Sequence, residues 1–345
     1  MTNTIKIFGC CLVFIGVHPL LAYSIVGFGA AAYSPAKYGI LTELLPAEKL
    51  VIANGWMEGL TVLSIISGTV LGGALINPTV SGLLLTYVFP FYSSTSVAAL
   101  TVVVIMYALA AIFNLRIPDT GARYKKQPKH PIELFKGFYV SFRTLWADKL
   151  GQISLAVTTL FWGAGATLQF IVLKWASDVL NLTLDKAAFL QGVFAVGITI
   201  GSILAARYVP LKKALSTMWL ALVMGFVVIC LTQITTIWLA YPVLIIIGAL
   251  AGFFIVPMNA LLQHRGYVLL SAGHSIAVQN FNENLSILGM LTMYSLLVWM
   301  DVSIHAIIVM FGLFVTGIMF CIIRWHAYNQ KIKDSTYLIG EAKRH

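Results

Sequence analysis

Residues 238–262 read WLAYPVLIIIGALAGFFIVPMNALL, without one acidic or basic side chain. A helix needs about 20 mostly apolar residues to cross the hydrocarbon core of a bilayer, which is roughly 30 Å thick. This stretch is long enough and apolar enough to do so. It therefore predicts a transmembrane α-helix, and the rest of the chain follows the same pattern.

The composition describes a protein that lies in lipid. Of the 345 residues, 59% are hydrophobic and only 10% are charged, and the mean hydropathy is +0.91. Soluble globular chains carry about 25% charged residues. A soluble domain, a disordered chain, a nucleic-acid-binding protein and a disulfide scaffold are excluded, because each needs polar residues or cysteines that are missing.

Apolar runs of sufficient length recur along the chain, separated by polar or proline-marked breaks. Ten fit, the first of them short: 4–17, 20–41, 51–76, 97–115, 153–175, 187–208, 215–234, 238–262, 275–299 and 304–325. We expect an all-α integral membrane protein with about ten transmembrane helices in two bundles, four in the first and six in the second.

Basic residues fall on alternate connections between these spans, above all in the linker 116–149. Lys and Arg are retained in the cytoplasm, so this linker and both chain ends are expected on the cytoplasmic side. The predicted divisions are an N-terminal bundle over 1–115, the basic linker 116–149, a six-helix bundle over 150–327 and a cytoplasmic tail over 328–345.

Within the linker, apolar side chains recur at helical spacing: Ile132, Phe135, Tyr139, Phe142 and Trp146. Lys136 and Arg143 lie on other faces. The pattern predicts a helix that either lies in the cytoplasmic membrane interface or packs on the bundle as an ordinary amphipathic helix. The sequence leaves both alternatives open.

Two pairs of spans resemble each other. The run GFGAAAYSPAK at 27–37 matches GALAGFFIVPMN at 248–259, and ANGWME at 53–58 matches VQNFNE at 278–283. In the first half, the matching spans are the second and third of four. In the second half, they are the fourth and fifth of six. We therefore expect a transporter of six plus six spans, the plan of the major facilitator superfamily, from which the first two spans are missing.

Charged side chains at membrane depth cost a few kcal/mol each and are by default functional. Those expected there are Lys37, Glu58 and Glu283. Amide side chains accompany them, and residues 279–284 should face the central cavity or the seam between the halves. The full set of predicted binding or gating residues is Lys37, Asn54, Glu58, Gln169, Asn259, Gln263, Gln279, Asn280, Asn282, Glu283 and Asn284.

Lys37 lies in the first half and Glu283 in the second, both near the expected cytoplasmic ends. We predict an ion pair between them that helps to close the cytoplasmic side in one state of alternating access. The alternative is a permanent pair between Lys37 and Glu58 within the first half.

The segments AAAYSPAKYGIL at 30–41, GFFIVPMNALLQHRG at 252–266 and AVQNFNEN at 277–284 resemble the bacterial lysophospholipid transporters of the major facilitator superfamily. The resemblance implies flipping of lysophospholipids, chiefly lysophosphatidylethanolamine, across the bacterial inner membrane. It also implies membrane lipids and a cytoplasmic-side lysophospholipid acyltransferase as partners. The amide cluster with Glu283 would bind the polar head, and the apolar faces of 153–175 and 238–262 would accommodate the acyl chain.

Two other classes of function compete with lysophospholipid transport. A cation-coupled exporter of drugs or small solutes would use Glu58 and Glu283 as proton carriers. A membrane acyltransferase would need a His-x-x-x-x-Asp arrangement or a Ser, His and Asp constellation, and the sequence shows neither. We expect no enzyme activity, no cofactor, no metal site and no nucleic-acid partner.

Overall fold

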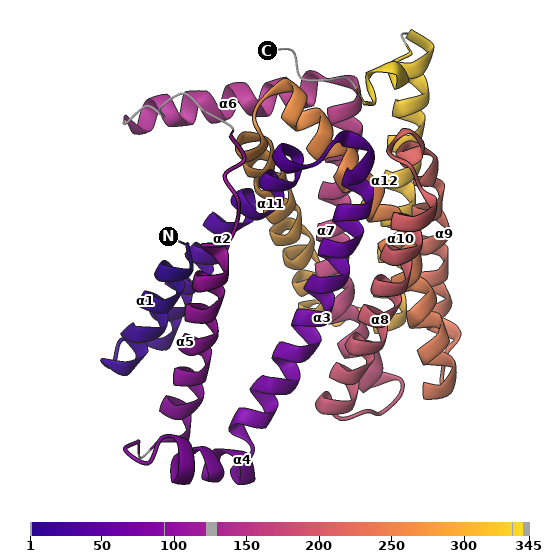
Figure 1. Cartoon of the computed structure of the whole chain (residues 1–345). Helices are drawn as coiled ribbons and strands as arrows, with labels where there is room; N and C mark the ends of the chain where they lie inside the picture. Colours follow the sequence, from indigo (N-terminus) through magenta and orange to yellow (C-terminus); the bar gives the residue numbers. More distant parts are fainter. Residues whose placement is uncertain (1, 93, 122–129, 333, 341–345) are drawn as a thin grey trace. The chain divides into compact units, whose positions relative to one another are not determined.

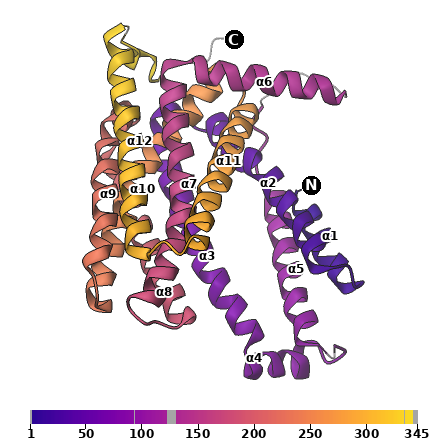
Figure 2. The same cartoon turned by 180° about the vertical axis from the view of Figure 1, so that it is seen from behind.

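The computed structural model describes residues 2–92, 94–121, 130–332 and 334–340. All regular secondary structure in these ranges is helical (Figures 1 and 2), which confirms the all-α prediction. The chain forms two compact units: unit 1 holds residues 1–40 and 63–124, and unit 2 holds residues 41–62 and 125–345. The helix α3 (Leu50–Ile76) is shared, because its first turns belong to unit 2.

Unit 1 is built from α1 (Thr2–Phe14), α2 (Pro19–Leu44, whose last residues join unit 2), the later turns of α3, α4 (Pro78–Leu83), η2 (Leu84–Val88) and α5 (Thr95–Asn114). Glycines let α1 and α2 approach closely. A Cβ on Gly9 would lie 2.8 Å from Val26 Cγ2, closer than van der Waals contact allows.

A short helix interrupts the uncharged connection 77–96, where hydropathy predicts no helix. Asn77 starts α4, because its side chain accepts a hydrogen bond from the Thr79 backbone N–H at 3.0 Å and Pro78 occupies the first turn. An asparagine cap followed by proline is a local helix-start signal. Hydropathy alone does not show it, because the segment is short.

Unit 2 contains the first turns of α3 and the helices α6 (Pro131–Ala147), α7 (Lys149–Asp178), α8 (Leu184–Tyr208), α9 (Trp219–Ile229), α10 (Ile237–Leu269), α11 (Ala272–Trp299) and α12 (Ile304–Ile332). Short helical segments complete it: η1 (Ala47–Lys49), η3 (Leu211–Thr217), η4 (Cys230–Gln233) and η5 (Thr336–Leu338). Figures 1 and 2 show α6 crosswise over one end of the bundle.

Small residues join α8 to α10. A Cβ on Gly197 or Gly201 of α8 would overlap the backbone carbonyls of Ile245 and Ala249, and one on Gly252 of α10 would overlap that of Ile198. Without side chains at these points the backbones approach directly, as is typical of helix pairs in membranes. Phe194 and Ile198 of α8 and Ala251 of α10, close to this contact, line an apolar cavity.

Seven helices in the described ranges are long and apolar enough to cross a membrane: Ala47–Leu75, Thr95–Asn114, Lys149–Asp178, Lys186–Tyr208, Leu211–Gln233, Ile237–Leu269 and Ile304–Ile332. The other three predicted spans correspond to α1, α2 and α11. The first is a shorter apolar helix. The other two have lower hydropathy because α2 includes Ser34, Pro35 and Lys37 and α11 carries the polar stretch 279–284.

The linker helix is confirmed as α6. Its packed side holds Phe138, Phe142 and Trp146, which contact a buried cluster of Leu145, Leu155, Leu262 and Val278. Phe135 and Tyr139 remain 76% and 64% exposed. The helix thus packs on the bundle along one side and leaves an aromatic strip open, and its position in the membrane interface stays a prediction.

Candidate functional site

A reciprocal amide pair joins α3 to α10 inside unit 2. Asn54 Nδ2 donates to Gln263 Oε1 at 2.8 Å, and Gln263 Nε2 donates to Asn54 Oδ1 at 2.9 Å. Asn54 also donates to the Leu50 carbonyl at 2.9 Å. Both side chains are only 3% exposed. The structure thus brings together two of the predicted site residues that lie more than 200 positions apart in the chain.

One turn earlier on α10, a second polar contact reaches α11. Gln279 Nε2 donates to Asn259 Oδ1 at 3.2 Å and to Glu283 Oε1 at 2.7 Å. Gln279, Asn259 and Glu283 are all at least nine-tenths buried. The Gln279 Oε1 atom is also buried and accepts no hydrogen bond from the residues that the structure describes. This oxygen can therefore still accept a hydrogen bond from another donor.

Three other predicted residues of α11 lie outside these contacts. Asn282 is buried and donates to the Val278 carbonyl at 2.8 Å. Asn284 is exposed and donates to the Asn280 carbonyl at 2.7 Å. Six consecutive residues spread around a helix by 100° each, so they cannot all join one contact.

An apolar cavity of about 250 Å³ lies within unit 2. Its walls come from α7, α8, α9, α10, α11 and α12, and include Phe161, Leu168, Phe194, Met224 and Phe311. Three polar groups border it: Glu58, Gln169 and Trp162. The Trp162 indole N–H is buried and has no acceptor among the described residues.

The cavity and the amide pair share one face of α3. Asn54 and Glu58 are four residues apart on this helix, and residues at this spacing lie one above the other. Glu58 is 9% exposed and borders the cavity, whereas Asn54 bonds to α10. The apolar volume therefore adjoins a polar rim, the arrangement that an amphipathic ligand requires.

Lys37 belongs to unit 1, whereas Glu58 and Glu283 belong to unit 2. The predicted pair between Lys37 and Glu283, and its alternative with Glu58, therefore both remain predictions. Lys37 Nζ lies 4.9 Å from the centre of the neighbouring Tyr38 ring.

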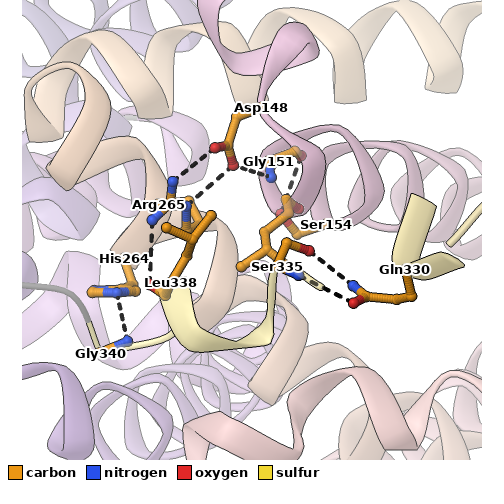
Figure 3. Close-up of polar contacts among 10 residues, drawn as sticks. Asp148, Gly151, Ser154, His264, Arg265, Gln330, Ser335, Leu338 and Gly340 are labelled. Atoms are coloured by element: carbon orange, nitrogen blue, oxygen red, sulfur yellow. Dashed lines mark hydrogen bonds and ion pairs between the residues drawn. The ribbon is translucent and has the colours of Figure 1, made fainter. Parts of the chain in front are cut away.

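A network that the sequence did not predict surrounds Asp148, which lies between the end of α6 and the start of α7 (Figure 3). Arg265 donates from Nη2 to Asp148 Oδ1 at 2.7 Å and from Nε to Asp148 Oδ2 at 3.1 Å. Asp148 also caps α7, accepting from the Gly151 backbone N–H at 2.7 Å. The Arg265 and Asp148 side chains are 3% and 11% exposed.

The same network holds the chain after α12. Arg265 Nη1 donates to the Leu338 carbonyl at 3.2 Å, and the Gly340 backbone N–H donates to His264 Nε2 at 3.0 Å. Gln330 and Ser335 close the turn between them, with Gln330 Nε2 donating to Ser335 Oγ at 2.8 Å. The C-terminal segment is thus fixed to the end of α10 (Figure 3).

Only part of this network had a signal in the sequence. Asp148 immediately precedes a long apolar run, which is where a helix cap is expected. Arg265 lies on one of the basic connections between the predicted spans, a pattern that predicts only the cytoplasmic side. The charge bias of a loop is the same whether its arginine is solvated or buried. The ion pair of Arg265 with Asp148 therefore becomes visible only in the folded structure.

A bundle of apolar helices with buried amides, a buried carboxylate and an apolar cavity is typical of a membrane transporter. Comparison with known proteins agrees with this class. Residues 4–286 match the family model of the Major Facilitator Superfamily. The chain belongs to this superfamily, and hence to a family of transporters and not of enzymes.

Its curated relatives define the branch. The chain is 41% identical over 306 residues to the lysophospholipid transporter LplT of Pectobacterium carotovorum subsp. carotovorum (strain PC1), covering 88% of this chain and 71% of that protein. It is 40% identical over 309 residues to LplT of Yersinia pestis (strain Pestoides F), covering 89% and 72%. The chain is therefore a member of the LplT family of multi-pass membrane proteins.

A solved structure supports the fold. A bacterial homologue of the iron transporter ferroportin, crystallised in an outward-facing state, aligns with a TM-score of 0.62 over 94% of this chain and 82% of that one. The sequence identity is 16%, so the likeness concerns architecture alone. The prediction of a major facilitator fold is confirmed.

Proposed function

We propose that this protein moves lysophospholipids of the phosphatidylethanolamine type across the bacterial inner membrane by alternating access. The relatives that carry the name lysophospholipid transporter share about two residues in five with nearly the whole of this chain. The observation that carries the proposal is the apolar cavity of about 250 Å³ with Glu58, Gln169 and the Trp162 indole at its border.

The cavity suits the acyl part of such a substrate. A lysophospholipid has one acyl chain, which needs an apolar surrounding to replace the hydrocarbon of the bilayer that it leaves. Rings and branched side chains line most of the cavity wall. The expectation that the faces of α7 and α10 hold the tail is consistent with this lining, because Phe161, Leu168 and Ala251 belong to these two helices.

The amide groups suit the polar head. Asn259, Gln279 and Glu283 offer donors and acceptors in one connected set, and Gln279 Oε1 has no donor among the described residues. An ammonium group donates three hydrogen bonds and a phosphate accepts several. We therefore assign head-group binding to this set and to Glu58, with Asn54 and Gln263 as a gate between α3 and α10.

The remaining assignments follow from the charge pattern. The basic connections and both termini are proposed to face the cytoplasm. The product is then delivered to the leaflet where a lysophospholipid acyltransferase would restore the second acyl chain. Glycine-rich helices that part sideways would let the substrate enter from the leaflet.

Reconstitution tests the function. The purified chain in lipid vesicles should translocate labelled lysophosphatidylethanolamine, and unlabelled lysophosphatidylethanolamine should compete. Glycerophosphoethanolamine, which has the head without the tail, should compete poorly. Flux that required a proton gradient and ignored lysolipids would instead favour the cation-coupled exporter.

A further inference from the structure

Lys6 is a cation within the apolar helix α1 of unit 1, outside every site described above. Its side chain crosses α2 at Gly29: a Cβ on Gly29 would lie 2.9 Å from Lys6 Cγ. Glycine at this position therefore gives the lysine stem its path. Gly29 and Tyr33 are four residues apart, so both lie on one face of α2.

The ammonium group ends between two tyrosine rings. Lys6 Nζ lies 4.9 Å from the centre of the Tyr33 ring on α2 and 5.5 Å from that of the Tyr107 ring on α5. These distances are within the range of cation–π attraction, which extends to about 6 Å. Three helices thus hold one positive charge in a defined place.

This charge has no carboxylate partner among the residues that the structure describes. Arg265 offers a contrast, because its guanidinium group is matched by Asp148. A charge within a membrane helix costs a few kcal/mol and commonly marks a substrate path. Aromatic rings offset part of this cost but accept none of the three N–H donors in a conventional hydrogen bond.

We propose that Lys6, held by Tyr33 and Tyr107, binds the phosphate of the transported lysolipid. This rests on the proposed function and extends it by naming a head-group contact in unit 1. A charge-assisted N–H···O⁻ bond between the Lys6 ammonium and a phosphate oxygen is about twice as strong as a neutral one.

The test compares ligands that differ only in the phosphate. Binding to the full chain in nanodiscs is measured by competition against fluorescent lysophosphatidylethanolamine, using lysophosphatidylethanolamine and a monoacylglycerol with the same acyl chain. Lys6→Met should weaken lysophosphatidylethanolamine binding by about tenfold, equivalent to roughly 1.4 kcal/mol. It should leave monoacylglycerol binding within about twofold, and Lys6→Arg should retain most of the affinity.

Two further variants separate binding from folding. Lys186→Met removes an exposed cation of α8 and should change neither affinity. Gly29→Ala keeps the charge but displaces the lysine stem, so it should weaken only the phosphate-bearing ligand. Glycerophosphoethanolamine, added as a third ligand, distinguishes a lipid phosphate site from one that binds any phosphodiester.

The outcomes are distinct. Equal loss for both ligands in Lys6→Met, or no loss for either, would overturn the role of Lys6 and leave the proposed function standing. A wild-type chain that binds monoacylglycerol but not lysophosphatidylethanolamine would overturn both.

Discussion

Two polar regions of unit 2 lie on the same helix, α10, and are built differently. At its end, Arg265 and Asp148 form a charged pair with two hydrogen bonds, to which the C-terminal segment is attached. Farther from that end, Asn54 with Gln263 and Asn259 with Gln279 make neutral contacts. Charged pairs that are buried are costly to break, whereas each neutral hydrogen bond contributes about 1 kcal/mol.

The difference indicates that the two regions have different roles. The ionic network keeps the ends of α7, α10 and the C-terminal segment together as one body. We propose that the amide contacts are weak enough to exchange partners when a polar head enters or when α3 moves against α10. Alternating access needs both properties, rigid bundles and contacts between elements that open at low cost.

The largest expected effect comes from breaking the ionic network on one side. Arg265→Met leaves the Asp148 carboxylate buried without its partner, which costs about 3–5 kcal/mol. We expect this loss in the free energy of unfolding, measured in detergent. The double variant Asp148→Leu with Arg265→Met should recover much of it, and a single variant as stable as wild type would contradict the assigned role.

The next largest effect is expected at the predicted ion pair between Lys37 and Glu283. If Lys37 and Glu283 pair in one state, Lys37→Glu places two carboxylates together at membrane depth and should reduce lysophosphatidylethanolamine transport by about tenfold or more. Combining it with Glu283→Lys should restore transport. The matched combination with Glu58→Lys tests the alternative pair, and rescue by that combination alone would identify Glu58 as the partner.

The smallest effect is expected at the amide pair. Asn54→Leu leaves Gln263 without its partner, at about 1–3 kcal/mol, and Gln263→Leu should act similarly. Replacing both should cost less than the sum, because no amide is then left unpaired. Unfolding free energies of the three variants give the coupling, and strict additivity would show that the pair is not an energetic unit.

Much of the fold could be predicted from the sequence, because lipid imposes simple requirements. Residues 238–262 lie within α10, and the linker pattern 132–146 lies within α6. The missed helix α4 is six residues long and starts from a local cap at Asn77. Hydropathy over a span-length window cannot detect an element of that size.

The site was predicted in its residues but not in its contacts. Asn54, Gln263, Gln279 and Glu283 were identified because polar groups in apolar helices are costly. Their partners depend on which helices pack together, and no local pattern shows that Asn54 meets Gln263. The Lys6 contacts were missed for the same reason, since both tyrosines lie on other helices.

We propose that the cavity of unit 2 holds the acyl chain of the transported lipid. Gly165 borders the cavity, and a Cβ there would meet no atom within 4 Å, so Gly165→Leu adds side-chain volume at the cavity wall and its Cβ meets no clash. Gly317 on α12 also has open space around it but does not line the cavity, and Gly317→Leu is the matched control.

The decisive measurement is translocation of labelled lysophosphatidylethanolamine by these two variants in vesicles. Gly165→Leu is expected to reduce transport by about tenfold while Gly317→Leu transports like the wild type, with both variants folded. Equal transport by both variants would contradict this proposal.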